Sequence, residues 1–318
     1  MFTAKTVPTF YFIGVSTARS SIMPVFPRWM QALGYNDVVI EGIDHPLHDD
    51  PAAYRRTVEF IKHDARSLGG LVTTHKIDLL HAARDYFDYL DESAQRLGEV
   101  SCISKRGALL AGHAKDPLTS RLSLEAVLGE NYFARTGGHV LCFGAGGAGK
   151  AIALYLLQKS GDQPSKMIVT DIAAARLEAL RALINQMPPR ISFDLMLMPA
   201  GSSGDDLLAA LPEGSVVINA TGMGKDTPGS PISDQALFPR HGVVWELNYR
   251  GDLLFWHQAM AQAAKQHLTV EDGWVYFLHG WTQVIAEVLH LELTAEKFAQ
   301  LAAIAADLRP PLTPKTAG

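Results

Sequence analysis

The amino-acid sequence predicts an α/β protein of two domains. Short apolar runs that indicate strands alternate with longer helical patterns over most of the 318 residues, which is the order expected for sheets covered by helices. The chain is also long enough for two packed cores. We expect an α/β domain over residues 1–117, a doubly wound parallel sheet over residues 118–268, and helices within residues 269–318 that pack back on the first domain.

The first domain is expected to contain five strands, with helices between the first three. One helix follows Asp50-Pro51, because aspartate caps free N–H groups and proline fits the first helical position. We expect it to run to about Leu68, and an earlier helix to cover residues 23–33. The expected strands cover residues 9–13, 38–40, 71–73, 100–104 and 108–111.

The second domain is expected to contain strands separated by helices, which favours a parallel sheet. After Asp272-Gly273, helical patterns cover residues 274–290 and 294–308, and a proline-containing tail that is expected to be extended or disordered follows. The expected strands cover residues 140–143, 167–170, 192–197, 216–219 and 243–247.

Composition argues against several classes of protein, among them nucleic-acid-binding, secreted and membrane-spanning proteins. A net charge of −5 at pH 7 argues against a nucleic-acid-binding surface. The two cysteines, Cys102 and Cys142, lie in apolar runs, and no Cys/His spacing suggests a metal site, so both are expected to be reduced core residues. The N-terminus lacks a signal-peptide core, and no apolar run is long enough to span a bilayer. We therefore expect a cytoplasmic protein.

A glycine-rich loop lies between an apolar strand and an apolar helix. Gly144, Gly146 and Gly149 form a G-x-G-x-x-G pattern whose other members are Ala145, Gly147 and Ala148. The first glycine permits a sharp turn, the second leaves room for a pyrophosphate, and the third lets the helix pack against the sheet. With its flanking elements, the loop predicts a Rossmann-type dinucleotide site, although a glycine-rich turn without a ligand is the simpler alternative.

Asp171 ends the next strand, 22 residues after Gly149. A carboxylate at this place accepts hydrogen bonds from a ribose diol and repels a 2′-phosphate. No arginine follows before Arg176. The pattern favours NAD over NADP as the cofactor.

Two charged residues follow predicted strands of the first domain. Lys76 comes shortly after the strand at 71–73, and Asp116 lies where the chain leaves the domain. Such a pair transfers a proton to or from an alcohol while a hydride moves to nicotinamide. The alternative without a catalytic role is that the lysine is solvated and that the aspartate caps a helix.

The order of these motifs resembles the shikimate/quinate dehydrogenase family. The resemblance rests on Lys76, Asp116, the glycine loop, residues 219–224 and Asp272-Gly273. It implies that Lys76 is the catalytic proton donor and acceptor, and that Asp116 holds the lysine and the substrate hydroxyl in line. It also implies a small-molecule substrate, a possible homodimer, and a turn beside the nicotinamide formed by Asn219, Ala220, Thr221 and Met223.

The sequence departs from the family pattern on the substrate side. Ser20 takes the place of the first carboxylate-binding serine, and the second falls on Ser21 or Ile22. The substrate-binding threonine falls on Val72 without a gap and on Thr73 with one. Ser101 stands where the family has asparagine, and Gln283 is the nearest replacement for a glutamine that falls on Gly280. The roles of Arg19, His75 and His113 stay open.

We therefore expect retained chemistry on a different substrate. The leading hypothesis is an NAD-dependent oxidoreductase that interconverts a secondary alcohol and a ketone on a small polar molecule, such as a hydroxy acid or a cyclitol-like ring. The alternatives are a true quinate or shikimate dehydrogenase with altered contacts, and a non-catalytic NAD-binding regulator.

Overall fold

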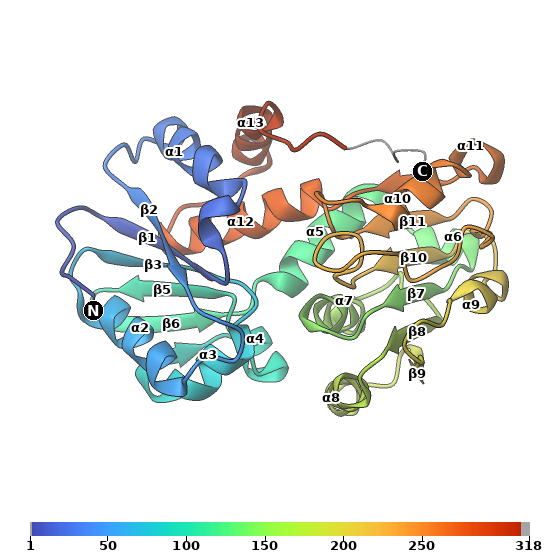
Figure 1. Cartoon of the computed structure of the whole chain (residues 1–318), viewed down its shortest axis with the longest axis horizontal. Coiled ribbons are helices and arrows are strands. Elements are labelled where there is room, and N and C mark those ends of the chain that lie inside the picture. Colours follow the sequence, from blue (N-terminus) through green and yellow to red (C-terminus); the bar gives the residue numbers. More distant parts are fainter. Residues whose placement is uncertain (1, 313–318) are drawn as a thin grey trace. The chain divides into compact units, whose positions relative to one another are not determined.

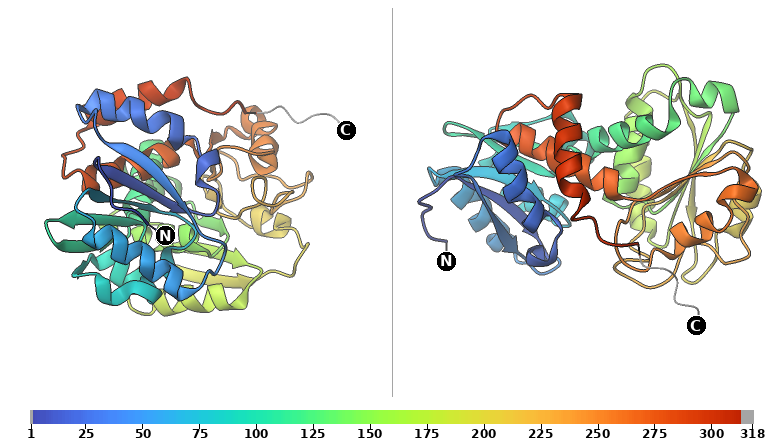
Figure 2. Two further views of the ribbon diagram at one scale, coloured as in Figure 1. Left: turned by 60° about the vertical axis from the view of Figure 1, so that its left-hand side comes forward. Right: turned by 90° about the horizontal axis from the view of Figure 1, so that it is seen from above.

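The computed structural model describes residues 2–312, and the chain divides into two compact units (Figures 1 and 2). Unit 1 comprises Met1–Asp116 and Leu278–Arg309, and unit 2 comprises Pro117–Phe277 with Pro310–Gly318. The predicted α/β class is confirmed, because each unit holds a sheet with helices against it.

Unit 1 is built on a mixed six-stranded sheet with the order β2-β1-β3-β5-β6-β4 within the described residues. Its strands are β1 (Thr9–Gly14), β2 (Val39–Asp44), β3 (Ser67–Val72), β4 (Tyr89–Leu90), β5 (Cys102–Arg106) and β6 (Leu109–His113). Its helices are α1 (Ile22–Leu33), α2 (Pro51–His63), α3 (Lys76–Ala83), α4 (Glu92–Leu97), α13 (Ala295–Ala306) and most of α12 (Trp274–Val288). β5 runs antiparallel to both β3 and β6, so β3 and β6 run in the same direction.

The core of unit 1 forms because β1 is apolar on both faces. All six residues of β1 are buried, and in Figure 1 the helices α1, α12 and α13 lie on one side of the sheet, with α2 and α3 on the other. Trp29 of α1 is fully buried, and its Nε1 donates a 2.7 Å hydrogen bond to the carbonyl of Leu301 in α13. The C-terminal helix is thereby fixed to an N-terminal one.

In the part of unit 2 that the structure describes, a parallel six-stranded sheet has the order β12-β11-β10-β7-β8-β9. Its strands are β7 (Val140–Phe143), β8 (Lys166–Asp171), β9 (Ser192–Leu197), β10 (Val216–Asn219), β11 (Val243–Glu246) and β12 (Thr269–Glu271). Its helices are α5 (Asp116–Leu128), α6 (Tyr132–Thr136), α7 (Gly147–Gln158), α8 (Ala174–Ile184), α9 (Asp205–Ala209), α10 (Leu254–Met260) and α11 (Ala263–Gln266). The doubly wound parallel sheet is as predicted.

Alternate residues of β7 face opposite sides of this sheet. Phe143 packs into a cluster with Phe238 and Phe255 of the segments after β10 and β11. Cys142 points to the other side, where its Sγ lies 3.7 Å from the place that a Cβ on Gly149 would take. Helix α7 therefore packs closely on the face opposite the cluster.

Several predicted boundaries were wrong. Helix α2 ends at His63 rather than near Leu68, because the Asp64 side chain accepts hydrogen bonds from the N–H of Arg66 and the hydroxyl of Ser67, where β3 begins. The short strands β4 and β12 were not predicted. The C-terminal part of unit 1 begins at Leu278 instead of residue 269, since residues 269–271 extend the sheet of unit 2.

Three further observations concern the described residues only. Across residues 2–312, helices are too short or too polar to cross a bilayer. The same part of the chain has no group of three or more His, Cys, Asp or Glu side chains that could hold a metal ion. Cys102 and Cys142 are buried free thiols. Pro314 and the rest of the predicted tail beyond residue 312 lie outside the described residues.

Candidate active site

Lys76 and Asp116 form an ion pair in unit 1. Lys76 is the first residue of α3, shortly after the end of β3, and Asp116 is the first residue of α5, shortly after the end of β6. Because β3 and β6 run in the same direction, both residues lie at the same edge of the sheet. Lys76 Nζ donates a hydrogen bond to Asp116 Oδ2. The side chains are 19% and 15% exposed, so both are accessible to a small molecule.

The loop before Lys76 is held firmly. The N–H of Thr73 donates to the carbonyl of Ile13 at 2.9 Å, and Thr74 adopts a left-handed conformation with φ of 58°. His75 is 1% exposed, and its Nδ1 lies 2.9 Å from the Tyr54 hydroxyl. Burial lowers the pKa of His75, so the imidazole is neutral near pH 7.

The pKa of Lys76 is raised above its ordinary value. Burial alone would lower the pKa, but the negative charges of Asp116 and Glu99 and the hydrogen bond to Asp116 together outweigh burial. Glu99 is 1% exposed, and the residue after it, Val100, donates its N–H to the carbonyl of Lys76 at 3.1 Å. Sequence reasoning missed Glu99, although an acid between Gly98 and an apolar run was a visible signal.

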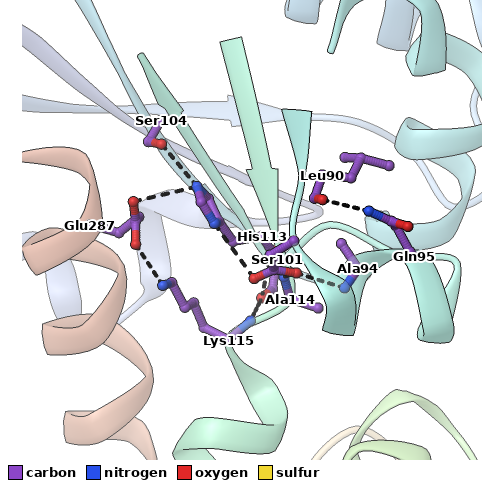
Figure 3. A network of polar contacts seen from close by, with 10 residues as sticks. Leu90, Ala94, Gln95, Ser101, Ser104, His113, Ala114, Lys115 and Glu287 are labelled. Carbon is purple, nitrogen blue, oxygen red and sulfur yellow. Dashed lines mark hydrogen bonds and ion pairs between the residues drawn. The ribbon is translucent and has the colours of Figure 1, made fainter. Parts of the chain in front are cut away.

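A polar network holds the chain just before Asp116 (Figure 3). Oδ1 of Asp91 accepts hydrogen bonds from the N–H of Ala94 and Ala114, at 2.7 and 3.2 Å. Lys115 Nζ lies 2.7 Å from Glu287 Oε2, which connects α12 to this strand end. The network fixes the backbone that presents Asp116.

In the same network, a serine, a histidine and an acid contact one another in that order. Ser104 Oγ lies 3.0 Å from His113 Nε2, and His113 Nδ1 lies 3.5 Å from Asp91 Oδ2. Ser104 is 1% exposed, and Glu287 Oε1 lies 3.4 Å from the same Nε2. A substrate has no access to that hydroxyl, so His113 and its neighbours are structural.

In unit 2 the glycine loop has the shape predicted for it. Gly144 has φ of 102°, and a Cβ there would lie 2.8 Å from the carbonyl oxygen of Ala220. A Cβ on Gly149 would lie 2.0 Å from the carbonyl oxygen of Gly144. By contrast, no atom lies within 4 Å of a Cβ built on Gly146, the N-cap of α7. The free N–H groups at the start of α7 thus border open space that suits a phosphate.

Asp171 supports this loop from the end of β8. Its Oδ2 accepts a 2.8 Å hydrogen bond from the N–H of Ala145, and its Oδ1 accepts one of 2.8 Å from the N–H of Ala173. Arg176 Nη1 lies 3.6 Å from Oδ1. Asp171 is 6% exposed, so one carboxylate both braces the loop and places a negative charge beside it.

The turn after β10 lies next to the glycine loop, because Ala220 donates its N–H to the carbonyl of Phe143 at 2.8 Å. Asn219 is fully buried, and its Oδ1 accepts hydrogen bonds from the N–H and hydroxyl of Thr221 at 3.1 and 2.6 Å. Its Nδ2 donates to Glu246 Oε2 at 2.5 Å. Both ends of the Asn219 amide therefore hold the turn, and the position of this turn beside a nicotinamide stays a prediction.

Glu246 was not predicted from the sequence either. The carboxyl is fully buried at the end of β11, beside Asn219 of the neighbouring strand. Burial raises its pKa to about 8, and the charge of Asp272 adds to this, against hydrogen bonds from Asn219 and Asn248. The buried acid Glu246 thus supports the turn that contains Thr221 and Met223 through its hydrogen bond to Asn219.

No known protein-family model matches the chain. Similar curated proteins are named shikimate dehydrogenase (NADP(+)). The one from Symbiobacterium thermophilum is 30% identical over 187 residues, which cover 58% of this chain and 60% of the relative. The one from Thermococcus kodakarensis is 29% identical over 237 residues, which cover 73% and 74%. The chain spans between 54% and 61% of the length of the first three relatives that it matches.

Solved structures share the fold over nearly the whole chain. A shikimate dehydrogenase in complex with NADP+ has a TM-score of 0.73 at 19% identity and covers 97% of this chain and 98% of its own. Quinate dehydrogenase from Corynebacterium glutamicum in complex with NAD has a TM-score of 0.72 at 21% identity. The match covers 95% of this chain and 99% of that chain. The 5-ketofructose reductase of Gluconobacter sp. strain CHM43 has a TM-score of 0.70 at 22% identity. The match covers 93% of this chain and 98% of that chain.

In sequence the chain is similar to shikimate dehydrogenases, and its fold is shared with shikimate and quinate dehydrogenases. The residues predicted to bind substrate lie at different places in unit 1. Val72 is fully buried in β3, whereas Thr73 is half-buried and its methyl group lies 3.0 Å from the place of a Cβ on Gly14. Thr73 is thus the hydroxyl available at the edge of β1 and β3. The methyl group of Thr17 also lies beside Gly14, at 3.2 Å from that Cβ position.

The other predicted contacts of the shikimate/quinate dehydrogenase pattern differ in accessibility. Ser20 is 9% exposed at the start of α1, next to half-buried Ser21 and fully buried Ile22. Gln283 is half-buried on α12, one turn before Glu287 and on the same face. Arg19 is exposed.

Ser101, predicted to contact substrate, is bonded to the backbone in this structure. It is 3% exposed, and its Oγ accepts a 2.8 Å hydrogen bond from the N–H of Lys115 and donates to the carbonyl of His113 at 3.5 Å. The hydroxyl is engaged by the backbone before Asp116. Ser101 thus holds the strand end, and its contact with substrate stays a prediction.

Proposed function

We propose that the protein is a nicotinamide-dependent dehydrogenase that interconverts a secondary alcohol and a ketone on a small polar substrate. The Lys76–Asp116 ion pair carries the proposal, because an accessible ammonium and carboxylate lie together at one sheet edge. The names of the relatives, which are shikimate dehydrogenases, support the same reaction class.

Lys76 is the proton relay in this proposal. In the oxidation, the substrate hydroxyl loses its proton to the neutral amine of Lys76 as the hydride leaves the carbon that bears this hydroxyl. In the reduction, the ammonium returns a proton to the carbonyl oxygen. Asp116 orients Nζ through its hydrogen bond and offers its second oxygen to the substrate hydroxyl. A bound nicotinamide ring supplies the hydride acceptor or donor.

The residues of unit 2 fit a dinucleotide. Gly146 leaves open space at the N-terminus of α7, where a pyrophosphate is stabilised by free N–H groups and the helix dipole. We propose NAD as the preferred cofactor, since a 2′-phosphate would meet the Asp171 carboxylate. The curated relatives are named for NADP(+), so this preference is the point at which the chain departs from them.

The substrate is proposed to differ from shikimate. Ser101 is buried and engaged by the backbone, and Gly280 has no side chain, so two amide groups of the family pattern have no counterpart there. A site built around several substrate hydroxyls discriminates strongly against ligands that leave its polar groups unpaired. A small hydroxy acid or a cyclitol-like ring is the proposed class.

The test is a substrate panel followed by nicotinamide absorbance with NAD and with NADP. The panel contains quinate, shikimate, cyclitols, small hydroxy acids and 5-ketofructose. Turnover of a compound other than quinate or shikimate with NAD supports the proposal. Turnover of quinate or shikimate supports the second candidate, a true quinate or shikimate dehydrogenase. Tight NAD binding without turnover of any compound supports the third, a non-catalytic regulator.

A further inference from the structure

The strand order of unit 2 distinguishes two halves of the proposed dinucleotide site. In the order β9-β8-β7-β10-β11-β12, the chain runs outward from β7 on one side and from β10 on the other, as in doubly wound sheets that bind one nucleotide on each half. The glycine loop and Asp171 follow β7 and β8. The carboxyl ends of β10 and β11 therefore belong to the other half, which in the proposed cofactor takes the nicotinamide nucleotide.

Asn248 lies just beyond β11 in this second half. It is 7% exposed, and its backbone is held on both sides: its N–H donates to Glu246 Oε1 at 2.7 Å, and its carbonyl accepts the N–H of Gly273 at 3.1 Å. A Cβ on Gly273 would lie 1.9 Å from the carbonyl oxygen of Leu247, so this close approach requires glycine. The Asn248 side chain thus extends from a fixed backbone.

The Asn248 amide bonds to the carbonyl side of the turn after β10. Its Nδ2 donates to the carbonyl oxygens of Thr221 and Met223 at 3.2 and 3.3 Å. It also donates to Glu246 Oε1 at 2.7 Å. An amide nitrogen carries two hydrogens, so the three acceptors share them. One buried side chain thereby ties two main-chain carbonyls of the turn to the Glu246 carboxyl.

The other side of the same turn is held from β10. Asn219 Oδ1 accepts the N–H and the hydroxyl of Thr221, and the Thr221 hydroxyl accepts the N–H of Met223 at 3.2 Å. Asn219 Nδ2 donates to Glu246 Oε2. Asn219 and Asn248 thus bond to opposite sides of one turn and to the two oxygens of one carboxyl. Thr221 and Met223 are half-buried, so the turn still borders solvent.

We propose that Asn248 is a positioning residue for the nicotinamide half of the cofactor, because it fixes the turn that borders this half. The inference rests on the proposed function and adds to it a residue that acts through the main chain of Thr221 and Met223. Loss of the two carbonyl bonds frees the turn to move. The glycine loop is held separately by Asp171, so the pyrophosphate end of the site is unaffected. The loss of affinity should be confined to the nicotinamide.

The experiment compares two ligands that differ in the nicotinamide. The dissociation constants of NAD and ADP-ribose are measured by isothermal titration calorimetry with the full-length protein, at a temperature at which circular dichroism shows each variant to be folded. Asn248→Ala should bind NAD about tenfold more weakly than wild type, a loss of about 1.4 kcal/mol. ADP-ribose, which lacks the ring, should bind as it does to wild type. If wild type prefers NADP, the pair is NADP and 2′-phospho-ADP-ribose.

Gln262→Ala is the matched control. The Gln262 amide also bonds to a main-chain carbonyl of unit 2, since its Nε2 donates to Ala236 at 2.9 Å. Its partner lies before β11, however, whereas Asn248 follows that strand. Gln262→Ala should lower the thermal midpoint and leave the affinities for both ligands unchanged. If Asn248→Ala does not fold, Asn248→Ser is used; its hydroxyl offers one donor for two carbonyls, so NAD alone should again bind more weakly.

An equal loss of affinity for NAD and ADP-ribose in a folded Asn248 variant would overturn the inference, and so would unchanged affinity for both. If wild type bound neither NAD nor NADP, the proposed function would fail and this inference would fail with it. The two failures are distinguishable, because the first is seen only in the variant and the second already in wild type.

Discussion

The Asp171 carboxylate accepts the N–H of Ala145 at 2.8 Å, so the end of β8 braces the glycine loop that follows β7. In the proposed NAD site, this one side chain both holds the loop and supplies the charge that would lie beside the ribose. Asp171→Asn removes the charge and keeps an acceptor for Ala145, while its amide nitrogen replaces the oxygen that accepts from Ala173. The ratio of NADP to NAD efficiency should rise about tenfold, corresponding to about 1.4 kcal/mol of removed repulsion. The measurement is kcat/KM with each cofactor. Asp194→Asn, on the neighbouring strand β9, is the control, and an unchanged ratio in Asp171→Asn would contradict the NAD proposal.

Lys76→Ala tests the proton relay. Turnover should fall by about 10²–10⁴, which is the usual contribution of general acid–base catalysis. Cofactor affinity, followed by fluorescence titration, should stay constant because the glycine loop belongs to unit 2. Lys62→Ala removes another lysine of unit 1 that pairs with an acid, Asp88, and should retain turnover. Full activity in Lys76→Ala would remove this lysine from the mechanism.

Gly146→Ala separates ligand binding from folding. The added methyl group has open space in the protein alone, so the thermal midpoint should change little. Dinucleotide binding should weaken at least tenfold, because the methyl group occupies the approach of the pyrophosphate. Gly149→Ala is the contrasting variant: its Cβ would lie 2.0 Å from the Gly144 carbonyl oxygen, so it should destabilise unit 2 even without ligand. Unaltered NAD affinity in Gly146→Ala would place the phosphates elsewhere.

Because the pKa of Glu246 is raised, we expect the free energy of unfolding to depend on pH. Burial raises its pKa to about 8 in the folded chain, against 4.5 for the ordinary carboxyl. Between these values the folded state holds one more proton than the unfolded state, so the free energy of unfolding falls as pH rises. The slope from this group is at most about 1.4 kcal/mol per pH unit. Thermal unfolding from pH 5 to pH 8 should show this decline in wild type and a flatter curve in Glu246→Gln. Parallel curves would mean that Glu246 is ionised when folded.

Thr74 adopts a strained backbone conformation in the loop before Lys76. Its φ of 58° is unfavourable for a β-branched residue, and the side chain is exposed. Thr74→Gly should therefore raise the free energy of unfolding by about 0.5–1 kcal/mol, measured by urea denaturation. Thr73→Gly, at the half-buried neighbour, is the control and should lower it. A loss of stability in Thr74→Gly would show that Thr74 makes contacts that outweigh the strain.

The second unit was predictable because its signals are local. Glycine spacing, an acid at a strand end and apolar strands of four to six residues lie close together in sequence and determine one βαβ arrangement. The role of Asn219 was less predictable, since its partner Glu246 lies on another strand and only the folded sheet brings the two side chains together.

Except for the short β4, the strands of the first unit were predictable, but its chemistry was less so. The ion pair of Lys76 and Asp116 was expected from motif order, and the structure joins them. The engagement of Ser101 by the backbone around Lys115 follows from the way β5 and β6 end, which sequence patterns do not specify. The end of α2 was misplaced because Asp64 starts a turn that helical periodicity does not reveal.

The hydrogen bond from Trp29 to Leu301 joins positions 272 residues apart, and this separation affects how the protein folds during synthesis. At a synthesis rate of about 5–20 residues per second, α1 waits roughly 15 to 55 s for its partner α13. During that time the apolar face of α1 has no helix α13 to cover it, while all of unit 2 is being made. The domain that emerges from the ribosome first is thus completed last, and expression at low temperature or with holdase chaperones should favour soluble yield.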